Sequence, residues 1–157
     1  MRLMGIDYST IKTGYAVMDE GKLLESGAIE LFNLNSIKER RKYLLARLND
    51  IAHKYNVDTI VLERLRLFHH SKIPFKAILK LASIVYMLID NFPIVYSIDT
   101  RTWKRLVLGR ASATKDDAMG YVLIEYQKDV SHDEADAICI AESAFCPDVI
   151  KYLKLED

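Results

Sequence analysis

Three short apolar segments near the N-terminus, followed by alternating helical and strand-like segments, limit the fold of this chain most strongly. The three segments span 3–8, 13–18 and 23–31, and turn residues at 19–22 predict a hairpin between the second and the third. Hydrophobic periodicity predicts the remaining elements, which are a helix at 36–55, a strand at 57–62, a helix at 72–90, a strand at 93–98, a short helix from 100, and helices at 116–127 and 132–145. An antiparallel meander followed by βα units predicts an α/β fold with a five-stranded mixed sheet between helices.

The composition indicates one compact domain over residues 1–157. Half of the chain is hydrophobic, with only six Gly and three Pro, so it can bury a sizeable core and is neither disordered nor collagen-like. Cys139 and Cys146 lie in an apolar run without metal-binding spacing, which fits a reducing cytosol. No basic leader precedes an apolar stretch, and no apolar run reaches about 18 residues, so we expect a cytoplasmic protein without a membrane segment.

The charges are unevenly distributed along a chain whose net charge is zero. Residues 64–115 carry ten basic and two acidic side chains, whereas 116–128 and 129–157 have net charges of −2 and −6. A basic middle beside an acidic end is what a phosphate-binding surface next to an acidic metal site requires. A chance distribution of surface charge is the alternative explanation.

Two acidic residues lie at the ends of predicted strands that are otherwise apolar. Asp7 interrupts the first segment, where a buried carboxylate is costly unless it is paired or binds a metal. Glu63 follows the fourth predicted strand, at the end where α/β proteins place their chemistry. The alternatives are a structural Asp7 that accepts bonds from backbone amides and a solvated Glu63.

Two more acids open the last predicted helix. Asp133 and Asp136 are three residues apart and share a face that continues with small and apolar residues, so both turn inward. For Asp133 the alternative is helix capping, because Ser131 and Glu134 have the spacing of a capping box. Four carboxylates on three buried elements exceed what capping explains, and carboxylate oxygens suit Mg²⁺ or Mn²⁺. Such a cluster can hold two ions about 4 Å apart for phosphodiester hydrolysis.

At these residues the chain resembles the RuvC family of Holliday-junction resolvases, which has the RNase H-like fold. The resemblance runs from Leu3 to about Ala144. Its motifs are Gly5-Ile6-Asp7 followed by Thr13-Gly14-Tyr15, the strand that ends in Glu63, Ser112-Ala113-Thr114-Lys115, and Asp133-x-x-Asp136-Ala137. Each motif is weak alone, but the four occur in order and at appropriate spacing.

The resemblance implies a crossover junction endonuclease that hydrolyses branched DNA with two Mg²⁺ or Mn²⁺ ions per site. The residues that it implies as catalytic metal ligands are Asp7, Glu63, Asp133 and Asp136. It also implies that Lys115 approaches the scissile phosphate and that Lys104 occupies the position of a functional lysine. The alternatives are a solvated lysine at a helix start for Lys115 and a surface lysine for Lys104. The acids that follow Lys115 in the first helical turn already interact favourably with the helix dipole, so a cation at this position is expected to have another role.

The basic middle of the chain would face the DNA phosphates and give affinity without sequence reading. Its candidate DNA-binding residues are Arg64, Arg66, Phe68, Lys72, Lys76, Arg101, Lys104, Arg105 and Arg110. Arg66 stands where the family usually has a wedge aromatic, so Phe68 is a candidate for stacking on an unpaired base, with a core position as the alternative. Tyr8-Ser9 replaces the family's Pro-Gly, and His132 is a further candidate ligand. These departures suggest a divergent branch, such as a virus-encoded one.

The helix predicted at 72–90 is apolar on nearly all sides. One sheet face cannot bury such a helix, which supports a homodimer in which part of it meets a second subunit. Two other functions are alternatives: an RNA nuclease of the YqgF type, and a junction-binding protein without catalysis. The Asp133 and Asp136 pair and Lys115 favour the resolvase over the RNA enzyme, and four intact acids argue against a non-catalytic protein.

Overall fold

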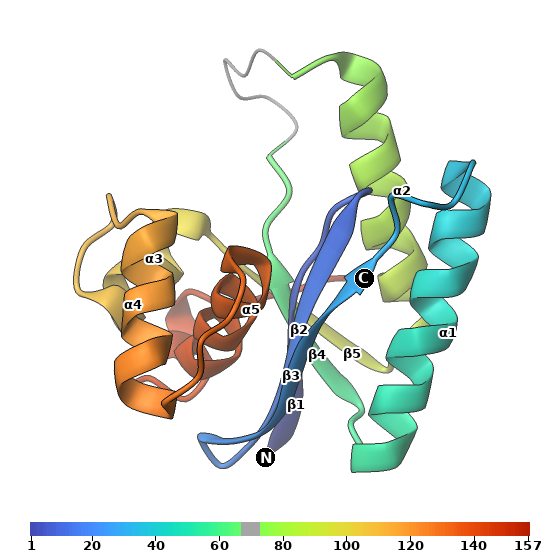
Figure 1. The fold of residues 1–157 in the computed structure, drawn as a ribbon. Helices are drawn as coiled ribbons and strands as arrows, with labels where there is room; N and C mark the ends of the chain where they lie inside the picture. The colour runs from blue at the N-terminus through green and yellow to red at the C-terminus, as the bar shows by residue number, and fades with distance from the viewer. Residues whose placement is uncertain (67–72) are drawn as a thin grey trace.

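The computed structural model describes residues 1–66 and 73–157, which form a six-stranded sheet with helices on both faces (Figure 1). The strands are β1 (Arg2–Asp7), β2 (Lys12–Asp19), β3 (Lys22–Glu30), β4 (Thr59–Glu63), β5 (Ile94–Ile98) and β6 (Lys154–Leu155). The helices are α1 (Ile37–Tyr55), α2 (Phe75–Asn91), α3 (Thr100–Leu108), α4 (Lys115–Tyr126) and α5 (His132–Ser143), followed by a 3-10 turn at Val149–Lys151. The expected α/β fold is confirmed.

The sheet is mixed and has the strand order β3-β2-β1-β4-β5-β6. Strands β1, β2 and β3 form an antiparallel meander, and β4 and β5 run parallel to β1. The predicted number of five strands is wrong by one, because β6 pairs antiparallel with β5 at the edge of the sheet. This strand has two residues, both exposed, so its sequence has no apolar alternation that could indicate a strand.

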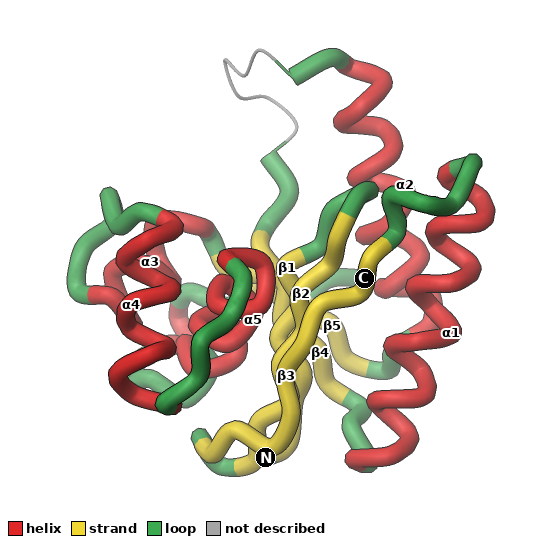
Figure 2. Tube along the Cα trace, in the orientation of Figure 1, coloured by secondary structure: helices red, strands yellow, loops and turns green. Residues whose placement is uncertain are grey.

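Two helical layers cover the sheet, with α1 and α2 on one face and α3, α4 and α5 on the other (Figure 2). Successive residues of β1 serve the two layers in turn: Met4 and Ile6 pack with α1 and α2, whereas Leu3 packs with the other layer. This alternation follows from the pleat of a strand that is buried on both faces. Among the described helices, none combines the length and the apolarity that crossing a lipid bilayer requires.

The helix starts agree with the sequence prediction to within a few residues. Ser36 caps α1, where its hydroxyl accepts a bond from the Glu39 N–H at 3.1 Å. Helix α2 begins at Phe75, later than the predicted residue 72, because the extended Pro74 is its N-cap rather than part of the first turn. Lys72 and Phe68 lie outside the described residues.

Two strand glycines let α5 approach the sheet unusually closely. A Cβ atom on Gly14 would lie 1.9 Å from the Asp133 carbonyl oxygen, and one on Gly5 would lie 2.5 Å from that of Ala137. No other residue type fits at such positions, since any side chain would overlap the helix backbone. The glycines of β1 and β2 therefore fix α5, and the acids at its start, directly against the sheet.

Candidate active site

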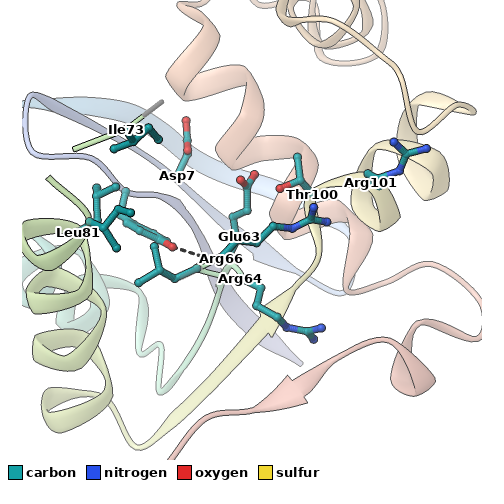
Figure 3. Close-up of a pocket in the computed structure, with 11 residues that line it drawn as sticks. Asp7, Glu63, Arg64, Arg66, Ile73, Leu81, Thr100 and Arg101 are labelled. Atoms are coloured by element: carbon teal, nitrogen blue, oxygen red, sulfur yellow. Dashed lines mark hydrogen bonds between the residues drawn. The ribbon is translucent and has the colours of Figure 1, made fainter. Parts of the chain in front are cut away.

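Asp7 and Glu63 lie side by side at the carboxyl ends of the two central parallel strands. Gly5 pairs with Val61 and Ile6 with Leu62, so the two acids follow in register at the ends of β1 and β4. Both side chains lie on the face of the sheet that α5 covers. Asp7 is two residues after Gly5, which contacts α5, and Glu63 is two residues after Val61, which packs in the core between the sheet and α3, α4 and α5. The close-up in Figure 3 shows the two carboxylates on neighbouring strands, with α5 behind them and the start of α3, at Thr100 and Arg101, to one side.

Helix α5 brings the other two acids to the same place. Asp133 and Asp136 line a cavity of about 300 Å³ together with Asp7 and Glu63. The other lining residues are Thr100, Trp103, Lys104, Lys115 and His132. The sequence therefore singled out every acid of this cavity and both of its lysines.

Asp133 does not act as the helix cap. The cap of α5 is Ser131, whose hydroxyl accepts a bond from the Glu134 N–H at 3.4 Å. The Glu134 carboxylate turns away and accepts a bond from the Ser26 hydroxyl at 2.7 Å. Asp133 instead has Lys12 Nζ at 4.0 Å and His132 Nε2 at 3.4 Å. Lys12, at the start of β2, is a cation that the sequence does not point to, because only the packing of α5 on β2 brings it to Asp133.

The acids of the cavity repel one another. Burial, followed by the charges of Asp136, Glu63 and Asp133, raises the pKa of Asp7 to about 8, against a smaller opposing effect of Lys115. Burial and the charge of Glu63 raise the pKa of Asp136 to about 6, while Lys104 and Lys115 oppose the increase. Carboxylates in this state are stabilised in their charged form by any cation that enters the cavity.

The donor set fits a hard divalent cation. All four acids offer oxygen ligands, and no sulfur ligand lines the cavity. Within 1–66 and 73–157, no three His, Cys, Asp or Glu side chains are gathered closely enough to hold an ion as they lie.

Glu63 accepts one hydrogen bond at its carboxylate and another at its backbone carbonyl. The Trp103 Nε1–H donates to its Oε2 at 3.1 Å, and the Tyr8 hydroxyl donates to its backbone carbonyl at 3.0 Å. The sequence reasoning assigned no role to Trp103 and treated Tyr8 only as a departure from the family pattern. Neither contact has a local sequence signal, because the partners are 40 and 55 residues apart.

The predicted DNA-binding residues occupy different environments. The Arg64 guanidinium bonds to Ser97 and to the Tyr152 carbonyl, so it is engaged within the protein. Arg66 pairs with Asp99, and Arg110 pairs with Asp117 at 2.9 Å. Arg105 lies over the Tyr152 ring at 5.3 Å, and Lys104 over the Trp103 ring at 5.6 Å. Lys76 and Arg101 are exposed.

A second cavity of about 460 Å³ adjoins the acids on their other side (Figure 3). It shares Asp7, Glu63 and Thr100 with the first cavity. Its remaining walls are Tyr8, Arg64, Leu65, Arg66, Ile73, Ile78, Leu81 and Arg101. Asp7 and Glu63 thus lie between a charged cavity and a largely apolar one that has arginines on its walls.

A mixed sheet with acids at the ends of its central strands, crossed by a helix that adds two more, defines the chain as an RNase H-like α/β protein. The sequence profile of the family described as crossover junction endodeoxyribonuclease RuvC matches residues 3–143. The chain belongs to this family, which confirms the resemblance found in the sequence.

Individual relatives agree with the assignment. The crossover junction endodeoxyribonuclease RuvC of Brachyspira hyodysenteriae is 26% identical over 146 residues, covering 90% of this chain and 91% of the relative. That of Ehrlichia ruminantium is 25% identical over 152 residues, covering 90% and 94%. Thermus thermophilus RuvC has the same fold, with a TM-score of 0.74 at 21% identity over 99% of this chain and 100% of that one. The same protein in complex with a Holliday junction substrate gives a TM-score of 0.70 at 20% identity, over 92% and 93%.

Proposed function

We propose that this chain is a metal-dependent endonuclease that resolves four-way (Holliday) or other branched DNA junctions. The observation that supports this most is the cavity shared by Asp7, Glu63, Asp133 and Asp136, in a chain that belongs to the RuvC family. A fold relative, Thermus thermophilus RuvC, has been solved with a Holliday junction substrate, which supports branched DNA as the ligand here.

In this proposal the four acids hold two Mg²⁺ or Mn²⁺ ions. The chemistry that bound ions supply is activation of water at neutral pH and stabilisation of the leaving oxygen of the phosphodiester. The chain's own residues create the conditions for it: burial raises the pKa of Asp7, so a cation is favoured beside its charged form, and the hydrogen bonds to Glu63 restrict its orientation. Lys104 and Lys115 bring positive charge to the same cavity, where the four carboxylates would otherwise repel a phosphate.

The DNA-binding part of the proposal rests on the cations that are free to reach phosphates. Lys76 and Arg101 are exposed, and Arg66 and Arg110 each have one acidic partner at the surface. Arg64 would have to give up its bonds to Ser97 and Tyr152 to contact DNA, so we assign it a structural role. Phosphate contacts of this kind give affinity that falls with salt and does not depend on sequence.

We further propose that the protein acts as a homodimer through α2. Phe75, Leu79 and Tyr86 lie along one face of this helix and are 73%, 53% and 62% exposed. Because they are four and seven residues apart, their side chains form one apolar stripe along the helix, and this stripe is exposed to solvent in a single subunit. A two-fold contact between such stripes would direct two sites at two strands of a symmetric junction.

The test is cleavage of a synthetic four-way junction beside linear duplex DNA and structured RNA. We expect cleavage of the junction with Mg²⁺ or Mn²⁺, none in EDTA, and binding without cleavage in Ca²⁺, whose coordination is too loose for the reaction. Preferred cleavage of RNA would support the YqgF-type alternative instead. Junction binding without cleavage under every metal condition would support the non-catalytic alternative.

A further inference from the structure

The carboxylate of Glu63 is held by a buried tryptophan. Trp103, in α3, is fully buried and donates its only polar hydrogen to Glu63 Oε2 at 3.1 Å. A buried indole N–H needs an acceptor, and this carboxylate is the one it has, so the ring and the acid fix each other. This bond reduces the rotational freedom of a glutamate, which has three rotatable side-chain bonds.

Tyr8 holds the same residue at its backbone. The hydroxyl of this residue, which directly follows β1, donates to the Glu63 carbonyl at 3.0 Å and fixes the end of β4 relative to the end of β1. The two bonds therefore act on different parts of Glu63: one fixes the main chain and the other the carboxylate.

The Trp103 ring also lies beside the ammonium group of the next residue, Lys104. The Lys104 ammonium lies 5.6 Å from the centre of the Trp103 ring, and its charge opposes the increase that burial and Glu63 cause in the pKa of Asp136. One aromatic ring thus contacts the acid at the end of β4 and the cation that faces the acids of α5. Trp103 is fully buried, so the position of its ring is set by the packing of the core.

We propose that Trp103 and Tyr8 are positioning residues that preorient Glu63 as a metal ligand, an inference that rests on the proposed function, in which Glu63 binds the metal. The Trp103 N–H bonds to Oε2, whereas no donor within residues 1–66 and 73–157 bonds to Oε1. Hydrogen bonds that orient metal ligands typically change metal affinity about 10- to 100-fold when they are removed. In this proposal the two residues act through Glu63 and are not themselves metal ligands.

The chain allows an unusually clean test because Trp103 is its only tryptophan. Biosynthetic replacement of tryptophan by 3-benzothienylalanine exchanges the indole N–H for sulfur at this one position and keeps the ring shape. Trp103→Phe is the second variant, and Tyr8→Phe removes the other bond. The matched control is Tyr126→Phe, which removes a tyrosine hydroxyl that donates to a glutamate, Glu142, at 2.7 Å away from the cavity.

The readout is Mn²⁺ binding to the metal-free protein without DNA, measured from the electron paramagnetic resonance signal of free Mn²⁺. We expect about tenfold weaker binding in the benzothienyl protein and in Trp103→Phe, and a smaller loss in Tyr8→Phe. Tyr126→Phe should bind as the unchanged protein does. In the cleavage assay the benzothienyl protein, Trp103→Phe and Tyr8→Phe should need more Mn²⁺ for half-maximal rate and should reach the rate of the unchanged protein at saturating Mn²⁺.

Equal Mn²⁺ affinity in the benzothienyl and unchanged proteins would overturn the inference, because only the N–H differs. Failure of the unchanged protein to bind Mn²⁺ would overturn both this inference and the proposed metal dependence. If the variants bind Mn²⁺ more weakly but the unchanged protein does not cleave junctions, the positioning role stands and junction resolution fails.

Discussion

Asp7 is an acid at the end of a strand buried on both faces, and its surroundings raise the pKa of its carboxyl group to about 8. Its unusual position was predictable from sequence, because a buried carboxylate in an apolar strand is costly unless it is paired or binds a metal. The roles of Tyr8 and Trp103 were not, since their bonds to Glu63 join residues far apart in the chain. Local patterns thus indicate which residues are unusual, whereas their partners depend on the tertiary fold.

The raised pKa of Asp7 predicts a pH-dependent stability in the metal-free protein. A folded-state pKa near 8, above the ordinary value of 3.8, means that folding favours the protonated carboxyl group. The contribution of Asp7 to stability is therefore fully present below about pH 4 and is lost as the pH rises through about 8. Asp7→Asn should flatten this profile and raise the melting temperature at pH 8 by about 4 °C or more.

Thermal unfolding in EDTA between pH 5 and 9 measures this effect. The control is Asp50→Asn on the exposed face of α1, which should leave the profile unchanged. A melting temperature that falls in Asp7→Asn at every pH would mean that Asp7 is a structural acid rather than an electrostatically strained one.

At the scale of elements, the position of α5 depends on two glycines that a periodicity analysis does not interpret. The helices and strands were predictable to within a few residues, because apolar periodicity and capping residues are local signals. The close packing of α5 was not, although Gly5 and Gly14 inside strands are a usable sign of close backbone approach. Strand β6 was missed because two exposed residues carry no pattern.

Gly14→Ala should destabilise the protein and disturb its acids together. The added Cβ would lie 1.9 Å from the Asp133 carbonyl oxygen, so α5 must shift away from β2. We expect a loss of about 3 kcal/mol or more in the free energy of unfolding by urea, and weaker Mn²⁺ binding because Asp133 moves with the helix.

Gly120→Ala is the matched control, since nothing lies within 4 Å of the added Cβ on α4. Alanine within a helix should stabilise it by about 0.5–1 kcal/mol. Similar free energies of unfolding for the two alanine variants would show that the approach of α5 to the sheet is not limited by Gly14.

At the scale of the whole molecule, the uneven charge along the sequence becomes an arrangement in space. The acidic end supplies Asp133 and Asp136 to a cavity that the basic middle enters through Lys104 and Lys115. The sequence predicted this meeting of opposite charges although the net charge is zero. It also predicted an apolar α2, but which of its residues face outward depends on how the helix lies on the sheet: Val85 is buried, and Tyr86 is exposed.

The exposed stripe on α2 predicts that a charge there prevents dimer formation. Leu79→Glu places a carboxylate at the centre of the Phe75, Leu79 and Tyr86 face, where burial against a second copy would be costly. Sedimentation velocity at tens of micromolar should show a dimer for the unchanged protein and a monomer for the variant. Ile124→Glu on α4, at a residue 77% exposed, is the control and should remain dimeric. A monomeric unchanged protein, with and without junction DNA, would refute the dimer.

The most direct measurement of the central claim compares the unchanged protein with Glu63→Gln on one four-way junction in Mg²⁺. Glutamine keeps the shape of the side chain but removes its charge, so a metal-dependent site at Glu63 should lose at least about 10³-fold in cleavage rate. Junction affinity in the same samples should stay within about threefold, because Glu63 contributes no positive charge to DNA binding. Cleavage by Glu63→Gln at the rate of the unchanged protein would contradict the account, since the shared acidic cavity would then not be the site of the reaction.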